Sequence, residues 1–161
     1  MADDITFRLA GAEDAARLNA ALRALSDDLG DTHKATDDDI LRAGFGKDPA
    51  FRAILALRGD AVVGVAVFSA LYSTTRARAG AYVSDLWVAE AARGARIGPR
   101  LLAFVRDDIA ARWGGGFIRL AVYTDNSRAV DFYRRMGFSA QSGEVGMILE
   151  GAALAAIGAP D

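Results

Sequence analysis

The chain has 161 residues, a formal charge of −2 at pH 7 and no cysteine. A chain of this length can bury the core of one domain without cross-links, so we expect a single domain over residues 1–161. The lack of cysteine excludes structural disulfides, thiolate zinc sites and a cysteine nucleophile, and the charge balance argues against nucleic acid as a partner.

The ends and the single histidine add further expectations. No apolar run approaches the roughly 18 residues that a membrane span needs, so no membrane partner is expected. The start of the chain, Met1-Ala2-Asp3-Asp4, is acidic and has no signal-peptide pattern. We expect a cytoplasmic protein without a metal site. His33 lies in a polar stretch and is expected on the surface.

The first third of the chain predicts a strand and two helices. Ile5–Leu9 alternates apolar and polar residues, as a strand does. Ala12–Leu29 carries leucines at helical spacing and is expected to end near Gly30. Thr36 is a typical N-cap, and Asp37–Asp39 would stabilise the first turn of the helix that follows.

The middle of the chain predicts three strands. The apolar runs Phe51–Leu57 and Ala61–Leu71 flank Gly59, whose conformational freedom permits a tight turn. These two runs should therefore form a β-hairpin. Tyr82–Val88 is expected to be the third strand of this group.

The last part of the chain alternates between helices and strands. We expect a helix over Gly98–Trp113, a strand over Phe117–Tyr123, and a helix over Ser127–Met136 that Gly137 caps. Met147–Leu149 is expected to close the sheet. The order of these elements predicts a mixed α/β fold.

The loop before the third helix has the composition of an anion site. It reads Arg93-Gly94-Ala95-Arg96-Ile97-Gly98-Pro99-Arg100. The first N–H groups of a helix have no internal partner and attract negative charge, and glycine lets a ligand approach the main chain. The alternative is an ordinary loop with solvated arginines, because neither the Walker A nor the Rossmann pattern occurs.

Two segments in order carry a family resemblance. Arg93 to Gly98, after a strand ending Asp85-Leu86-Trp87-Val88, resembles the acetyl-CoA motif of the GNAT superfamily of N-acetyltransferases, Gln/Arg-x-x-Gly-x-Gly/Ala. The run Asn126-Ser127-Arg128-Ala129-Val130-Asp131-Phe132-Tyr133, followed by Met136-Gly137-Phe138, is similar to a second GNAT segment. The resemblance implies the GNAT fold, a mostly antiparallel central sheet with helices on both faces.

A narrower resemblance covers most of the chain from Leu18 onward. The stretches GFGKDPAF, YSTTRARAGAYVSDLWV and LEGAALAAIG resemble the spermidine/spermine acetyltransferase-like branch. This implies transfer of an acetyl group from acetyl-CoA to a primary amine of a small molecule, polyamine-like or lysine-like, by direct attack in a ternary complex. Relatives are often homodimers, so a homodimer is a further expectation.

The resemblance also implies roles for individual residues. The acetyl-CoA ligands would be Leu86, Trp87, Val88, Arg93, Gly94, Ala95, Arg96, Ile97, Gly98, Pro99, Arg100, Asn126, Arg128 and Ala129. Tyr133 falls at the position of the general acid that protonates the leaving thiolate. Asp27 and Asp28 would attract a cationic acceptor, although acidic runs are more often simply solvated.

The base is less clearly marked. The branch carries a glutamate where this chain has Ser84, so Asp85 is the candidate base or the group that positions the amine. Ser84 could hold a water. Alternation along a strand places neighbouring side chains on opposite faces, so both can serve one substrate only if a β-bulge intervenes. A structural strand-end role for Asp85 is the alternative.

Two departures from the family pattern leave other functions open. Arg96 stands where the family has its first glycine, and Pro99 removes one N–H from the loop. Together with Ser84, they motivate a rival in which the protein is a catalytically weak acyl-CoA-binding regulator. Among enzymes, the rival acceptors are an aminoglycoside or a peptide amine.

Overall fold

A computed structural model describes residues 4–159. The chain divides into two compact units, one up to Tyr123 and one from Thr124 on. The first unit contains β1 (Ile5–Leu9), the 3-10 turn η1 (Ala12–Asp14), α1 (Ala15–Leu29), α2 (Asp37–Phe45), β2 (Arg52–Arg58), β3 (Ala61–Ser73), β4 (Arg78–Val88), η2 (Glu90–Ala92), α3 (Ile97–Trp113) and β5 (Ile118–Leu120). The second contains α4 (Ser127–Arg135) and α5 (Gly151–Ala156).

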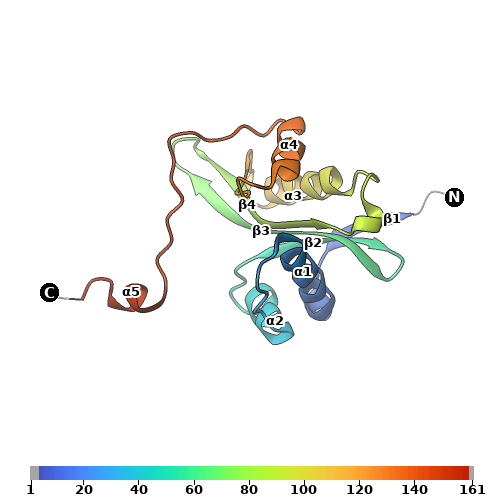
Figure 1. Cartoon of the computed structure of the whole chain (residues 1–161), viewed down its shortest axis with the longest axis horizontal. Helices are drawn as coiled ribbons and strands as arrows, with labels where there is room; N and C mark the ends of the chain where they lie inside the picture. The colour runs from blue at the N-terminus through green and yellow to red at the C-terminus, as the bar shows by residue number, and fades with distance from the viewer. Residues whose placement is uncertain (1–3, 160–161) are drawn as a thin grey trace. The chain divides into compact units, whose positions relative to one another are not determined.

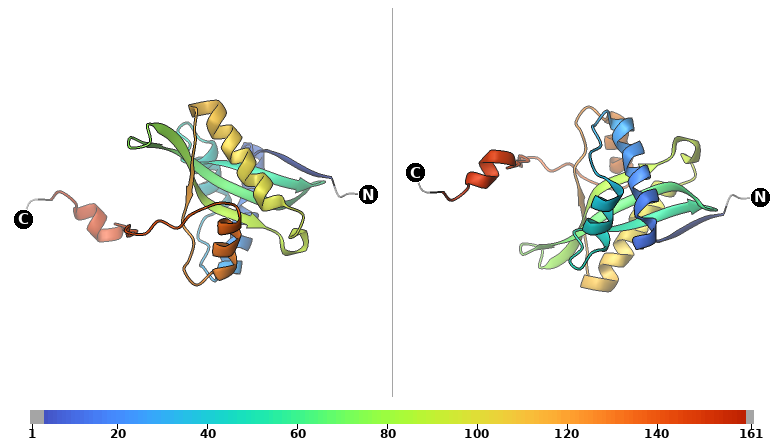
Figure 2. Two further views of the ribbon diagram at one scale, coloured as in Figure 1. Left: turned by 90° about the horizontal axis from the view of Figure 1, so that it is seen from above. Right: turned by 90° about the horizontal axis from the view of Figure 1, so that it is seen from below.

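The first unit is a five-stranded sheet in the order β1-β2-β3-β4-β5. The first four strands pair antiparallel, and β5 alone runs parallel to its neighbour β4. Helices α1 and α2 cover one face, while α3 crosses the other (Figures 1 and 2). The predicted fold class, a mostly antiparallel sheet with helices on both faces, is confirmed.

Alternation along the central strands supplies both faces of the core. Val65 and Val67 of β3 pack with Leu18 and Leu22 of α1 in one buried cluster. Gly64 lies on the opposite face, where an added Cβ would meet side chains of α3. A sheet buried on both faces suits the near-continuous apolar runs of β2 and β3.

The predicted helix ends are confirmed where the sequence offered a capping residue. Gly30 ends α1 in the left-handed conformation, with φ +74°. The Thr36 hydroxyl accepts from the Asp39 amide at 3.2 Å, and the Asp39 carboxylate accepts from the Thr36 amide at 2.9 Å. Thr36 and Asp39 thus form the reciprocal cap expected of this pattern.

A β-bulge interrupts β4. Val83 pairs with Phe68 and Asp85 pairs with Val67, which leaves Ser84 without a partner in β3. One extra residue shifts the alternation, so Ser84 and Asp85 both lie toward the face that α1 covers. The condition under which these two side chains could serve one substrate is therefore met.

Several boundaries differ from the predictions. The strand after α3 is shorter than Phe117–Tyr123, because β5 covers only Ile118–Leu120. Within the described residues Met147–Leu149 forms no strand, so its predicted place in the sheet of this chain is wrong. His33 is half-buried rather than simply exposed. The prediction about the first residues rests mainly on Met1 to Asp3, which lie outside the described residues.

The second unit has no buried core among its described residues. Neither α4 nor α5 contains a buried side chain. Asn126 caps α4, because its Oδ1 accepts from the Ala129 amide at 3.2 Å. Phe132, Tyr133 and Phe138 pack edge to face, with ring centroids 5.2 and 5.4 Å from that of Tyr133.

Candidate functional site

The loop between β4 and α3 presents a row of free amides. Within the described residues, the five N–H groups from Gly94 to Gly98 donate to no other group. Gly94 has φ +89° and Arg96 has φ +56°, so the chain turns twice through the left-handed region before α3 begins at Ile97. This concave run at a helix N-terminus is suited to bind a phosphate. Pro99 adds no donor.

Arg96 adopts the conformation that its motif position demands. The family has glycine there, and the left-handed region costs an ordinary residue about 1–2 kcal/mol. The Arg96 backbone has φ +56° and ψ +29° and precedes the helix as its N-cap. The loop therefore keeps the glycine-type shape despite the larger residue, and the exposed Arg96 side chain extends from it.

Gly64 has no Cβ, which lets the start of α3 pack closely against the sheet. Gly64 of β3 pairs with Val88 at the end of β4. A Cβ at position 64 would stand 2.8 Å from Ile97 Cγ2 and 3.2 Å from Leu101 Cδ1. Because both side chains belong to the buried first turns of α3, Gly64 sets how closely the helix N-terminus approaches the strand.

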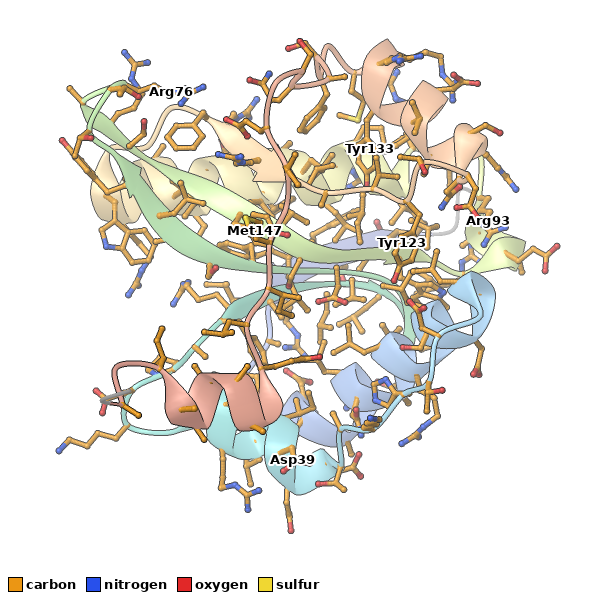
Figure 3. All side chains as sticks on the ribbon, turned by 60° about the vertical axis from the view of Figure 1, so that its left-hand side comes forward. Asp39, Arg76, Arg93, Tyr123, Tyr133 and Met147 are labelled. Carbon is orange, nitrogen blue, oxygen red and sulfur yellow. The ribbon has the colours of Figure 1, made fainter. Side chains whose placement is uncertain are left out.

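Two of the three arginines have partners in the protein. Arg93, which Figure 3 labels, has its guanidinium 3.4 Å from Asp28 Oδ2. The same oxygen accepts from the Trp87 indole at 3.2 Å. Arg100 stacks on the Phe7 ring, 4.1 Å from its centroid, and donates to the Ile5 carbonyl at 3.5 Å. The three arginines predicted as phosphate ligands therefore have different surroundings. Arg93 and Arg96 lie in the loop, whereas Arg100 packs against β1.

The carboxylate candidate is held beside an open stretch of strand. Ser84 Oγ donates to Asp85 Oδ2 at 2.7 Å and lies 3.4 Å from the Val67 carbonyl. Strand β4 pairs with β5 only over Ala81–Val83. Beyond the bulge, β4 pairs with β3 alone among the described strands, so no strand pairs with its other edge from Asp85 to Val88.

Acidic residues at and just after the end of α1 contact β4 and the segments that follow β4 and β5. Asp28 contacts Trp87 and Arg93, as described above, and Asp31 Oδ2 accepts from the Tyr123 hydroxyl at 3.0 Å. Asp27 is exposed. These contacts join residues 59 to 92 positions apart. No local pattern in the sequence could have indicated them.

The candidate acid lies in the second unit. Tyr133 is half-buried, and the partial loss of solvent raises the pKa of its phenol above the usual value. Asn126 and Ala129, predicted as cofactor ligands, form the cap of α4, and Arg128 is exposed in its first turn. The side chain of Asn126 therefore has a structural role as the cap of α4.

Comparison with known proteins places the chain in a family. The profile described as "Acetyltransferase (GNAT) family" matches residues 18–138. The chain belongs to this family. It is also 31% identical over 117 residues to the thialysine N-epsilon-acetyltransferases of Sus scrofa and Bos taurus, covering 68% of this chain and 68% of each relative. The resemblance seen in the two sequence motifs is confirmed, and the chain is an acyltransferase.

Solved structures support the fold. An integron cassette protein of V. cholerae aligns with TM-score 0.77 at 21% identity, covering 94% of this chain and 95% of its own. An aminoglycoside acetyltransferase from an uncultured soil metagenomic sample aligns with TM-score 0.75 at 16% identity, covering 91% and 95%. At these identities the likeness concerns the fold alone.

No group of three or more potential metal ligands gathers in residues 4–159. None of the helices in the same range combines the length and apolar character that crossing a membrane requires.

Proposed function

We propose that this protein transfers an acetyl group from acetyl-CoA to the primary amine of a small molecule. One observation carries the proposal: the free amides from Gly94 to Gly98 lie at the N-terminus of α3, directly after the open edge of β4. The amides would bind the diphosphate of coenzyme A. The pantetheine arm would then pair with the main chain of Leu86, Trp87 and Val88, which leads the thioester toward Asp85.

The reaction follows from that placement. The amine nitrogen attacks the thioester carbonyl carbon, a C–N bond forms and the C–S bond breaks, giving an amide and the CoA thiolate. An alkyl ammonium has a pKa near 10.4, so deprotonating it at neutral pH costs about 5 kcal/mol. In the proposal Asp85 accepts that proton, directly or through a water that the Ser84 hydroxyl holds. With no cysteine in the chain, no acetyl-cysteine intermediate arises.

Tyr133 supplies the second proton in this proposal. A thiolate needs a proton donor that is itself protonated at working pH, and burial raises the pKa of this phenol. The ring is held by Phe132 and Phe138, so its hydroxyl has a defined direction. The proton would pass from the phenol to the thiolate of coenzyme A, and solvent would restore it.

The acceptor class follows from charge and from the relatives. Asp27 and Asp28 end α1 with two negative charges, which would favour a cationic amine. The curated relatives are named for thialysine, an amine of lysine-like shape, and we propose a lysine-like or polyamine acceptor. An aminoglycoside is the second candidate, because a fold neighbour carries that name. Asp28 would have to exchange Arg93 for the substrate, so Asp27 is the more available of the two.

A panel of amines assayed by CoA release tests the function. Lysine analogues and polyamines should be turned over faster than aminoglycosides. Isothermal titration with CoA alone should show binding even where no acceptor is found. The absence of CoA binding at millimolar concentration would overturn the proposal.

The base is tested separately. Asp85→Asn should lower kcat by about 10²-fold or more with little change in CoA affinity. Ser84→Ala should lower it less. Asp38→Asn, which changes an exposed acid of α2, is the matched control and should leave kcat unchanged. An Asp85→Asn rate equal to that of the control would leave Asp85 with a structural role and favour the weakly catalytic regulator.

Three expectations remain proposals alongside this function. We propose that residues 1–161 act as one GNAT domain, that the protein works in the cytoplasm, and that it forms a homodimer.

A further inference from the structure

The Asp28 carboxylate lies between the end of β4 and the anion loop. Its Oδ2 accepts from the Trp87 indole at 3.2 Å and from the Arg93 guanidinium at 3.4 Å. The Arg93 amide donates to the Glu90 carbonyl at 3.2 Å, whereas the amides from Gly94 to Gly98 donate to no group among the described residues. Only the side chain of Arg93 can therefore change partners when a ligand enters the loop.

The ion pair between Asp28 and Arg93 is of a kind that breaks easily. The Arg93 side chain is 35% exposed and that of Asp28 is 49% exposed, and 3.4 Å is long for a charge-assisted hydrogen bond. An exposed pair of this kind changes an equilibrium constant by no more than about fivefold. A guanidinium forms shorter, two-pronged bonds with phosphate oxygens, and a diphosphate carries more negative charge than one carboxylate. A diphosphate in the loop should therefore take Arg93 from Asp28.

The freed carboxylate would keep its place. The Trp87 indole donates to the same Oδ2, so one hydrogen bond still orients Asp28 after Arg93 leaves. Trp87 and Asp85 both lie toward the face that α1 covers, and two residues along a strand span about 7 Å. Asp28 is thus suited to a second ammonium group of the acceptor, at a distance from the amine that Asp85 would deprotonate.

We propose that Arg93 and Asp28 form an exchangeable ion pair that couples the cofactor site to the acceptor site. In the free protein each charge satisfies the other. The diphosphate of coenzyme A draws Arg93 into the loop, and Asp28 then becomes available to the distal ammonium of a lysine-like or polyamine acceptor. Because binding free energies are reciprocal, the distal ammonium should favour CoA to the same degree. The inference rests on the proposed function and adds to it a preference for acceptors with a second cationic group.

The affinity for CoA in the absence of any amine gives the first test. Asp28→Asn removes the group that competes for Arg93, so the variant should bind CoA about threefold more tightly in isothermal titration. Glu90→Gln removes the same charge from an exposed residue near Arg93 and should change the affinity by less than about 1.5-fold. If Asp28 served only to hold the loop in shape, Asp28→Asn would weaken CoA binding instead.

A double-mutant cycle separates the exchange from the general effect of charge. Arg93→Gln places at this position the other residue of the family pattern and removes the positive charge. In that background Asp28→Asn should leave the CoA affinity unchanged, since no guanidinium remains to be released. Equal tightening in both backgrounds would mean that Asp28 acts on the phosphates directly, and would overturn the exchange.

Two amines of equal length test the acceptor side. 1,5-Diaminopentane carries a distal ammonium, and 1-aminopentane lacks it. Asp28→Asn should lower kcat/KM for the diamine by about fivefold and leave kcat/KM for the monoamine unchanged. In titrations without turnover, CoA should raise the affinity of the wild-type protein for the diamine by about threefold, and this increase should vanish in Asp28→Asn.

The outcomes distinguish this inference from the proposed function. A wild-type protein that binds no CoA at millimolar concentration would reject both. CoA binding together with an unchanged or weakened affinity in Asp28→Asn would reject the exchange and leave the proposed acetyl transfer intact. A diamine affinity that does not respond to CoA, or that responds equally in Asp28→Asn, would likewise reject the coupling.

Discussion

The parts of the chain before and after Tyr123 are held in different ways. In residues 4–123 the site rests on a core buried on both faces of the sheet, and the loop before α3 is fixed by close packing against Gly64. In residues 124–159 the candidate acid is held by two neighbouring rings, and no side chain is buried. The difference teaches that the candidate anion loop is positioned by a buried core, whereas Tyr133 is positioned by local ring contacts.

The largest expected effect lies in the second unit. Tyr133→Phe removes only the hydroxyl and keeps the ring contacts with Phe132 and Phe138. If the phenol protonates the thiolate, kcat should fall by about 10²-fold or more, while acetyl-CoA affinity measured by calorimetry stays within about twofold. Phe138→Leu, which alters the packing and keeps the phenol, is the control. If kcat of Tyr133→Phe stays within a factor of two of wild type, Tyr133 is not the proton donor.

The next effect concerns the stability that the buried Asp14 gives to the first unit. Asp14 is buried, accepts from both terminal nitrogens of Arg8 at 2.6 and 2.9 Å, and accepts from the Gly11 amide at 2.8 Å. The hydrogen bond from Arg8 holds the pKa of Asp14 below its usual value. Asp14→Asn should lower the free energy of unfolding by about 2 kcal/mol at pH 7, as measured by urea titration.

The pH dependence of that difference follows from the sign of the shift. A lowered pKa in the folded state gives stability that is complete above the unfolded value, near 3.9, and is lost as the pH falls through the folded value. The gap between wild type and Asp14→Asn should therefore be constant from about pH 7 to 5 and should shrink below about pH 4. Asp48→Asn, in an exposed loop, should change stability by less than about 0.5 kcal/mol.

A smaller effect tests the approach of α3 to the sheet. Gly64→Ala adds a Cβ that would stand 2.8 Å from Ile97 Cγ2, so the first turn of α3 must move. Overpacking of this kind costs about 1–3 kcal/mol. Acetyl-CoA affinity should fall as well, because the displaced turn carries the amides. If Gly64→Ala lowers stability but leaves acetyl-CoA affinity unchanged, the position of the first turn of α3 does not determine how the loop amides bind.

The smallest effect separates the backbone of Arg96 from its side chain. Arg96→Gly should be more stable than Arg96→Ala by about 1 kcal/mol, because only glycine adopts φ +56° without strain. If the guanidinium binds a phosphate, both variants should lose a similar factor in CoA affinity, roughly tenfold. Equal affinities in all three proteins would leave the binding to the amides alone.

The sequence predicted most of the first unit because its signals are local. Capping residues such as Thr36 and Gly30 mark helix ends, and apolar runs mark the central strands. The anion loop was predicted for the same reason, since glycine and a helix start lie within a few residues. Arg96 in the left-handed region was foreseen only as a departure from glycine.

What was missed depends on contacts between distant residues. The shared acceptor Asp28 joins Trp87 and Arg93 from 59 and 65 positions away. His33 is held by Asn19 at 2.7 Å and Ser26 at 3.2 Å, so a residue from a polar stretch became half-buried. Met147–Leu149 is apolar like a strand, but these residues form no strand, because a short apolar run does not by itself supply a pairing partner.

Ser84 is an extra residue in β4 that leaves the register of the strand end unchanged. Val83 and Asp85 pair with the consecutive residues Phe68 and Val67, so deleting Ser84 would leave Asp85 and Trp87 on their present face of the sheet. The indole would keep Asp28, and Asp85 would lose only the hydroxyl that now donates to it. Removing one codon would therefore take away the serine hydroxyl without turning the carboxylate, and the activity that is left would measure what this hydroxyl contributes.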